Sequence, residues 1–337
     1  MLSVLGRLVG WLTAWWLAFA VIGGAQATDL GVAGVPVALG KSGDYDGILA
    51  ALRDAGVTVY FPTSQYVEQP DAKSLGIESD FLPPCSSSAT AFEALRRHGM
   101  RLLIAGELLY ARGSGLPALQ NDPLKQVIAC AGRANVYGIL SYDEPVSTGA
   151  SLDDVSALFN RVKEVDSSLP VIMVHAPIIL DKPEFATAEG RQAYMREVKS
   201  YSRFADVVGF DVYPVVKDIA MTGTPSSEGE IVGHATAIRD YMAWLRSSIP
   251  GRSYMMVLQG FSYADQFEPE YLSKIAPAEM LAAVRAPTLE ETQEMAQLSI
   301  DGGAQLLIWW GVSFQKNETS QIWRDILTTT RAISGAK

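Results

Sequence analysis

The sequence contains few histidines and lacks several catalytic motifs, and these absences exclude whole classes of enzyme. The three histidines, His98, His175 and His234, form neither an H-x-H nor an H-E-x-x-H spacing, so no metal site is predicted. No G-x-S-x-G is present, which argues against a serine hydrolase with a nucleophile elbow. No G-x-G-x-x-G follows the first predicted strand, so a dinucleotide cofactor is not expected either.

Positive charge is also scarce. The chain of 337 residues has 27 lysines and arginines against 37 acidic residues, which gives a formal net charge of -10. No run of Lys or Arg forms a basic stripe along the sequence. A nucleic-acid partner is therefore not expected. The sequence says nothing about the oligomeric state.

Cysteine is limited to Cys85 and Cys130. Two cysteines in an exported protein are consistent with one disulfide, because such bonds persist in oxidising compartments. The alternative is two unpaired, buried thiols. The sequence does not measure the distance between them, so both readings stay open at this stage.

The N-terminus carries the pattern of a secretory signal peptide. One charge, Arg7, precedes an apolar stretch over residues 8–22, and Ala25-Gln26-Ala27 follows with the small residues of a cleavage site. We expect cleavage after Ala27, a mature chain from Thr28, and a secreted or periplasmic location without stable membrane insertion. The alternative is an uncleaved membrane anchor, since the stretch is close to spanning length.

Beyond the signal peptide, eight short apolar runs alternate with amphipathic helical segments. Continuous apolar runs are typical of strands that are buried on both faces. Eight such units predict a single (β/α)8 barrel over residues 28–337, with an open doubly wound sheet as the alternative. The predicted strands are 35–40, 57–62, 101–108, 136–145, 170–177, 207–214, 254–261 and 305–312.

Helix caps and loop lengths add detail to this prediction. Ser151 and Asp154, and Thr288 and Glu291, have the spacing of capping boxes, and Ser88 or a residue near it is expected to cap another helix. Long connections at 63–87, 215–230 and 262–287 are predicted to form a cleft on the C-terminal face of the barrel. Their aromatic residues include Tyr66, Phe81, Tyr263, Phe267 and Tyr271.

Polar and aromatic residues end most of the predicted strands. In a barrel they surround one opening, where active sites form. Two carboxyl groups beside a sugar are what glycoside cleavage needs, one to protonate the leaving oxygen and one to activate water or attack. Adjacent Trp309 and Trp310 should point to opposite faces, so that one packs under the helices. The candidates are Glu107, Asp143, Glu144, His175, Asp211, Tyr213, Gln259, Trp309 and Trp310.

Four segments resemble the barrel-fold glycoside hydrolases, in particular the clan of retaining enzymes that includes β-galactosidase and cellulase relatives. They are YDEP (142–145), ADVVGFDVYP (205–214), VLQGF (257–261) and DGGAQLLIWWG (301–311). The resemblance implies that Glu144 is the acid/base and that a Trp of the last segment meets the sugar.

The sequence departs from that clan at two positions. Asp143 stands where the clan has Asn, and Gln259 stands where the clan has its nucleophilic Glu. An amide cannot form a glycosyl ester. We therefore expect Asp211 to act as the base of an inverting reaction, with room for a water molecule between it and Glu144 and with Asp143 pointing elsewhere. The alternative is a non-catalytic carbohydrate-binding barrel.

Overall fold

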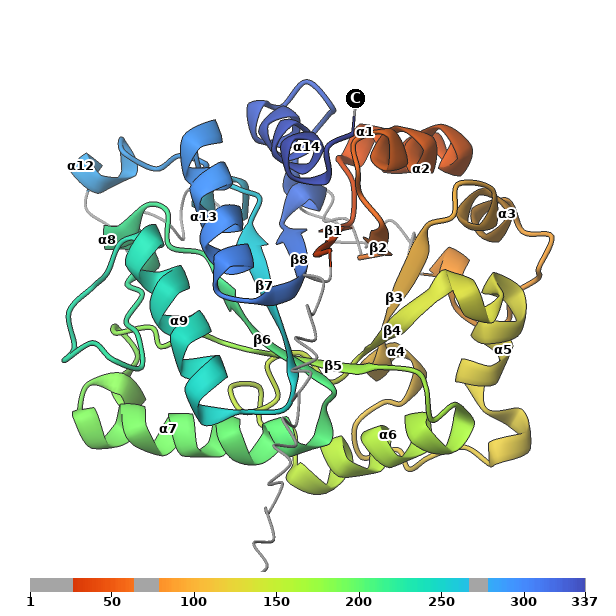
Figure 1. The fold of residues 1–337 in the computed structure, drawn as a ribbon, viewed down its shortest axis with the longest axis horizontal. Coiled ribbons are helices and arrows are strands. Elements are labelled where there is room, and N and C mark those ends of the chain that lie inside the picture. Colours follow the sequence, from red (N-terminus) through yellow and green to blue (C-terminus); the bar gives the residue numbers. More distant parts are fainter. Residues whose placement is uncertain (1–26, 64–78, 267–277, 337) are drawn as a thin grey trace, which may run out of the picture.

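The computed structural model describes residues 27–63, 79–266 and 278–336, and within them eight parallel strands form a closed barrel in chain order (Figure 1). The barrel closes between the first and last strands, where Asp29 pairs with Leu306. The predicted (β/α)8 barrel is thus confirmed, and the open sheet is excluded. The strands are β1 (Asp29–Ala33), β2 (Val59–Phe61), β3 (Arg101–Ala105), β4 (Val136–Leu140), β5 (Val171–His175), β6 (Val207–Val212), β7 (Ser253–Gln259) and β8 (Ala304–Trp310).

Helices surround this barrel (Figure 1). The predicted caps at Ser151 and Thr288 are confirmed, and Thr288 forms a complete capping box with Glu291. The cap expected at or near Ser88 is Ala89, which precedes the first residue of the helix, Thr90, and forms no side-chain cap bond. The helices are α1 (Val37–Ser42), α2 (Tyr45–Asp54), α3 (Thr90–Arg97), α4 (Gly106–Leu109), α5 (Pro123–Ala131), α6 (Leu152–Val165), α7 (Ala188–Tyr201), α8 (Lys217–Ala220), α9 (His234–Ser248), α10 (Tyr263–Gln266), α12 (Ala278–Leu281), α13 (Leu289–Asp301) and α14 (Gln321–Ser334).

The first strand lies earlier than predicted. The apolar run 35–40 does not form a strand, because β1 covers Asp29–Ala33 and Val37–Ser42 is helical. Pro36 explains the difference: a proline has no N–H to donate to a sheet, and here it occupies the N-cap position of α1. The predicted signal peptide is not tested, since residues 1–26 lie outside the described part of the chain.

The alternation of side chains along each strand separates two apolar layers. One layer fills the barrel and the other packs between strands and helices. On β6, Val207 belongs to the inner layer and Phe210 to the outer one. By the same alternation, the side chains of Asp211 and Tyr213 lie on the same face of the strand as Val207, toward the inside of the barrel. The inner layer consists of Ala33, Val59, Leu103, Leu140, Ile172, Val174, Val207, Met255, Val257, Leu306 and Ile308.

A close approach of two strands fixes the height of Asp211. Gly209 lies two residues before it on β6, and a Cβ atom at Gly209 would collide with the carbonyl oxygen and side chain of Met255 on β7. Only glycine fits this position without moving the backbone of β7. The tight β6–β7 contact thus holds the end of β6 in place beneath the opening of the barrel.

A disulfide and a satellite core hold the α3–α5 side of the barrel together. Cys85 and Cys130 form the predicted disulfide, which joins residues 45 apart in the sequence. Phe81, expected in the cleft, is instead buried against Tyr45, Tyr60 and Phe92.

Across the ranges that the structure describes, no helix has the length and apolar character needed to span a membrane.

Candidate active site

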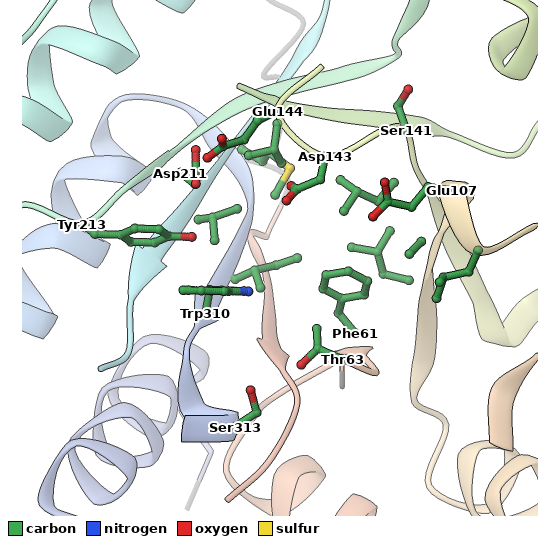
Figure 2. A pocket seen from close by; sticks show the side chains of 18 of the residues that line it. Phe61, Thr63, Glu107, Ser141, Asp143, Glu144, Asp211, Tyr213, Trp310 and Ser313 are labelled. Atoms are coloured by element: carbon green, nitrogen blue, oxygen red, sulfur yellow. The ribbon is translucent and has the colours of Figure 1, made fainter. Parts of the chain in front are cut away.

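A pocket of about 410 Å³ opens at the C-terminal ends of the strands (Figure 2). This volume lies within the usual range for small-ligand sites. Four carboxyl groups and two stacked aromatic rings gather around it. Six of the nine predicted site residues line the pocket, namely Glu107, Asp143, Glu144, Asp211, Tyr213 and Trp310.

The two adjacent acids after β4 both face this pocket. We expected Asp143 to point away from Glu144, as neighbours on a strand do, and this was wrong. The physical reason is that β4 ends at Leu140, so residues 141–144 are not bound to strand alternation. Glu144 has a φ of 40°, in the left-handed region that side chains rarely adopt. Such strain is found where function demands a particular direction, and here it turns both carboxyl groups toward the opening.

The turn that carries these acids is fixed by a compact set of hydrogen bonds. The Thr148 hydroxyl donates to the carbonyl oxygens of Asp143 (2.9 Å) and Glu144 (3.1 Å), and the Thr148 amide donates to Glu144 as well (2.9 Å). The Arg112 guanidinium donates to the Thr148 carbonyl at 3.1 Å. These contacts hold the strained backbone of Glu144 in one conformation.

Asp211 and Glu144 are in direct contact. Their carboxyl groups lie within hydrogen-bonding reach of each other, and Figure 2 shows both at the same wall of the pocket. Burial, followed by the charge of Glu144, raises the pKa of Asp211 well above its usual range. The space that we expected for a water molecule between the two acids is therefore absent. One oxygen of Asp211, Oδ1, is buried without a hydrogen-bond partner.

Asp143 lines the pocket and is exposed at its opening. Partial desolvation of its carboxyl group, together with the charges of Glu144 and Glu107, raises the pKa of Asp143 to about 7. Arg112 opposes the shift and lies 3.5 Å from the carboxylate of Glu107. At neutral pH the pocket thus holds carboxyl groups in both protonation states, as acid–base chemistry requires.

The part of the pocket wall beside Asp211 is aromatic (Figure 2). The rings of Tyr213 and Trp310 stack with centroids 5.3 Å apart and an interplanar angle of 19°. Phe261 and Phe314 hold Trp310 by edge-to-face contacts, and the Tyr263 hydroxyl donates to the Tyr213 carbonyl at 2.6 Å. The result is a rigid aromatic surface at the pocket, suited to the apolar face of a sugar ring.

Three predicted site residues lie elsewhere. Trp309 is fully buried in the outer layer, as expected for one member of the Trp pair, and is not in the pocket. His175 is also fully buried, its Nε2 lies 3.1 Å from the Ser202 hydroxyl, and burial lowers its pKa to about 3. Both end a strand on the face that meets the helices, so neither can bind a substrate in the pocket.

Gln259 is the third of these residues and has a structural contact instead. Its Oε1 accepts a hydrogen bond from the Val215 amide at 2.9 Å, and its Nε2 donates to the carbonyl oxygens of Val215 and Phe261. The side chain is fully buried. Gln259 therefore holds the loop after β6 rather than a ligand.

Several pocket residues were missed by the sequence reading. Phe61 and Thr63 lie at the end of β2, and Ser141 and Ser313 follow β4 and β8. The hydroxyl oxygens of Thr63 and Ser141 are buried with no partner, which leaves them available to a bound ligand. Their position directly after apolar strands was the available signal, but single hydroxyl residues are too common there to stand out. Among the described residues, no group of three or more possible metal ligands comes together.

Comparison with known proteins shows the fold alone. No protein-family model matches the sequence, and no curated protein does either. The structure is similar to those of glycoside hydrolases with barrel folds. A β-galactosidase from the haloarchaeon Halorubrum lacusprofundi gives a TM-score of 0.53 at 10% identity, over 91% of this chain and 58% of that one. A β-galactosidase from Rahnella sp. R3 gives 0.53 at 10% identity, over 92% and 56%. The endo-β-1,4-mannanase of Thermotoga petrophila gives 0.50 at 12% identity, over 94% and 78%. This chain thus spans little more than half of either galactosidase.

Proposed function

We propose that this protein is a glycoside hydrolase that cleaves a polysaccharide or oligosaccharide in the pocket at the C-terminal end of its barrel. The contact between Glu144 and Asp211 carries this proposal, because the pKa of Asp211 is raised and Asp211 therefore keeps a proton beside Glu144. Such a proton is available to a leaving glycosidic oxygen. The aromatic wall of Tyr213 and Trp310 supports a sugar as the ligand.

In this proposal Glu144 and Asp211 act as a catalytic pair with unequal roles. Glu144 is partly exposed to the pocket and Asp211 is buried beneath it. Glu144 is the general acid that protonates the glycosidic oxygen as its bond to the sugar carbon breaks. Asp211, which keeps a proton because its pKa is raised, supplies that proton to Glu144. The base role first expected for Asp211 suits a more accessible carboxylate.

Asp143 is the candidate for that second carboxylate. It lines the same pocket, and its pKa of about 7 allows it to accept a proton near neutral pH. An attacking water would give its proton to Asp143 while its oxygen bonds to the sugar carbon. Glu107 lies farther along the pocket wall, where its contact with Arg112 suits it to binding sugar hydroxyls. No cofactor enters this scheme.

One observation favours a second function. Strand β7 offers Gln259 in place of an acid, and its amide is fully used by Val215 and Phe261. A barrel that lost a nucleophile and kept its aromatic wall would bind carbohydrate without cleaving it. The two functions differ in their products, because only a hydrolase creates reducing ends.

The deciding experiment is incubation of the purified protein with a panel of polysaccharides, followed by measurement of new reducing ends. We expect at least one polysaccharide to be cleaved by the natural protein and not by Glu144→Gln. Binding of a polysaccharide without any new reducing end would support the binding function instead.

A further inference from the structure

A long groove lies on the outside of the barrel between α7 and α9, which are neighbours in Figure 1. It consists of two adjoining hollows of about 770 and 460 Å³ that share Arg196, Lys199 and Ser248. The groove begins at the loop 225–228 and continues to Arg252, just before β7. It is separate from the catalytic pocket, since the two have no residue in common.

The charge of this groove is opposite to that of the protein. The net charge of the chain is -10, yet the groove is lined by five basic residues and one acidic residue, Glu228. In the part of the chain that the structure describes, none of the five forms an ion pair. The basic residues are Arg191, Arg196, Lys199, Arg203 and Arg252.

Most of this charge forms a stripe along α7 and the turn that follows it. Arg196, Lys199 and Arg203 are separated by three and four residues, which places them on one side of α7 and of the turn after it, and all three are exposed. Like charges at such spacings repel each other and weaken a helix. A bound anion would remove this repulsion, so the stripe favours a negatively charged partner.

The remaining lining residues favour a sugar chain over a membrane or a bare ion. Hydroxyl groups of Ser226, Ser227, Ser248 and Ser200 lie among the cations, and the ring of Trp244 forms part of the wall. These groups match the hydroxyls and apolar faces of sugars. The exposed large apolar side chains among the described residues lie elsewhere, at Leu108, Leu116 and Leu289, so the groove lacks the groups that enter a bilayer.

We propose that the α7–α9 groove is a second binding site, one that holds an anionic polysaccharide along the outside of the barrel. Its carboxylate, sulfate or phosphate groups pair with the stripe on α7, and its hydroxyls meet the serines. The catalytic pocket carries four carboxyl groups and repels such a chain, so the two sites take different segments of glycan. This proposal does not depend on cleavage in the pocket.

The test is the binding of polygalacturonate to the purified protein, measured by isothermal titration calorimetry at low and moderate salt. We expect Arg196→Glu to weaken the affinity about tenfold or more, because reversing one charge turns an attraction into a repulsion. Arg246→Glu is the matched control, since Arg246 is an exposed arginine of the neighbouring helix α9 outside the groove. It should leave the affinity unchanged.

The other arms of the experiment separate the possible partners. A neutral glucan of similar length, single-stranded DNA and vesicles with anionic lipid should each bind less tightly than polygalacturonate. Equal effects of Arg196→Glu and Arg246→Glu would overturn the groove as the site. Tighter binding of DNA or vesicles, or equal binding of the neutral glucan, would overturn the assignment to an anionic polysaccharide.

Discussion

Glu144 meets Asp211 at one wall of the pocket, one acid coming from the turn after β4 and the other from the inner face of β6. The strained backbone of Glu144 makes this meeting possible, because regular strand geometry would not turn both Asp143 and Glu144 into the pocket. Two acids in contact cannot both ionise freely. The charge of Glu144 therefore helps to keep a proton on Asp211.

Replacing Glu144 by glutamine should abolish most of the activity on the polysaccharide that the natural protein cleaves. Glutamine keeps the shape but has no acidic proton, so kcat should fall by about 100-fold or more while binding persists. Asp211→Asn should also lower kcat, since it removes the group that shares the proton. Reducing-end assays and calorimetry with the same glycan measure both effects. Glu189→Gln, on the exposed first turn of α7, is the control, and near-normal turnover in Glu144→Gln would refute the role.

The two adjacent tryptophans should separate binding from stability. Trp310→Ala removes half of the aromatic wall, so the free energy of glycan binding should weaken by about 1–3 kcal/mol. Trp309→Ala leaves a cavity in the outer layer and should lower the free energy of unfolding by about 3–5 kcal/mol. Calorimetry and denaturant unfolding of both variants test this pair. An unchanged affinity in Trp310→Ala would place the sugar elsewhere.

The contribution of the two raised pocket acids to the stability of the protein should decrease as the pH rises from about 4 to about 7. The pKa of Asp143 is raised to about 7 in the folded state, so in this range Asp143 binds more protons in the folded protein than in the unfolded chain. The raised pKa of Asp211 acts in the same direction, whereas the lowered pKa of the buried His175 acts in the opposite one. Unfolding temperatures of the natural protein and of Asp143→Asn at a series of pH values isolate the contribution of Asp143, and between pH 4 and pH 7 the natural protein should lose stability relative to this variant. The control Asp181→Asn changes an exposed aspartate outside the pocket and should show the same pH dependence as the natural protein.

The disulfide should contribute substantially to stability. It closes a loop of 45 residues around α3 and part of α5, and the chain-entropy model then predicts that the double variant Cys85→Ser/Cys130→Ser loses about 2–4 kcal/mol of unfolding free energy. Denaturant unfolding of the two proteins measures the difference. Labelling of the denatured but unreduced natural protein should find no free thiol, and two labelled cysteines would contradict the bond.

Export should produce a chain that starts at Thr28. The A-x-A pattern that ends at Ala27 motivates this proposal, which concerns residues outside the described structure. Mass spectrometry of the protein recovered from outside the cytoplasm measures the N-terminus directly. Recovery of a membrane-bound form that keeps Met1 would favour the uncleaved anchor.

The barrel was predictable because its strands are apolar on both faces and recur at regular intervals. The wrong prediction of a strand at 35–40 was avoidable, since Pro36 within an apolar run argues against a central strand. The face of the barrel to which a side chain at a strand end points was harder to predict. Alternation required Trp309 and Trp310 to separate, but only packing against the neighbouring elements decides which of them faces the pocket.

The candidate site was partly hidden for the same reason. His175 and Gln259 lie at strand ends like the pocket acids. No sequence pattern predicts that they are buried against Ser202 and Val215. The contact between Glu144 and Asp211 depends on the left-handed backbone conformation of Glu144 after β4. No local sequence pattern predicts this conformation, because it is unusual for glutamate.

The closure of the barrel has a consequence for the synthesis of the chain. β1 starts at Asp29 and pairs with β8, which ends at Trp310, so the ring cannot close until almost the whole chain is available. A chain that stops before β8 would leave β1 and β7 as open edges, and such edges pair with other molecules. Premature termination should therefore produce aggregates rather than a smaller folded barrel.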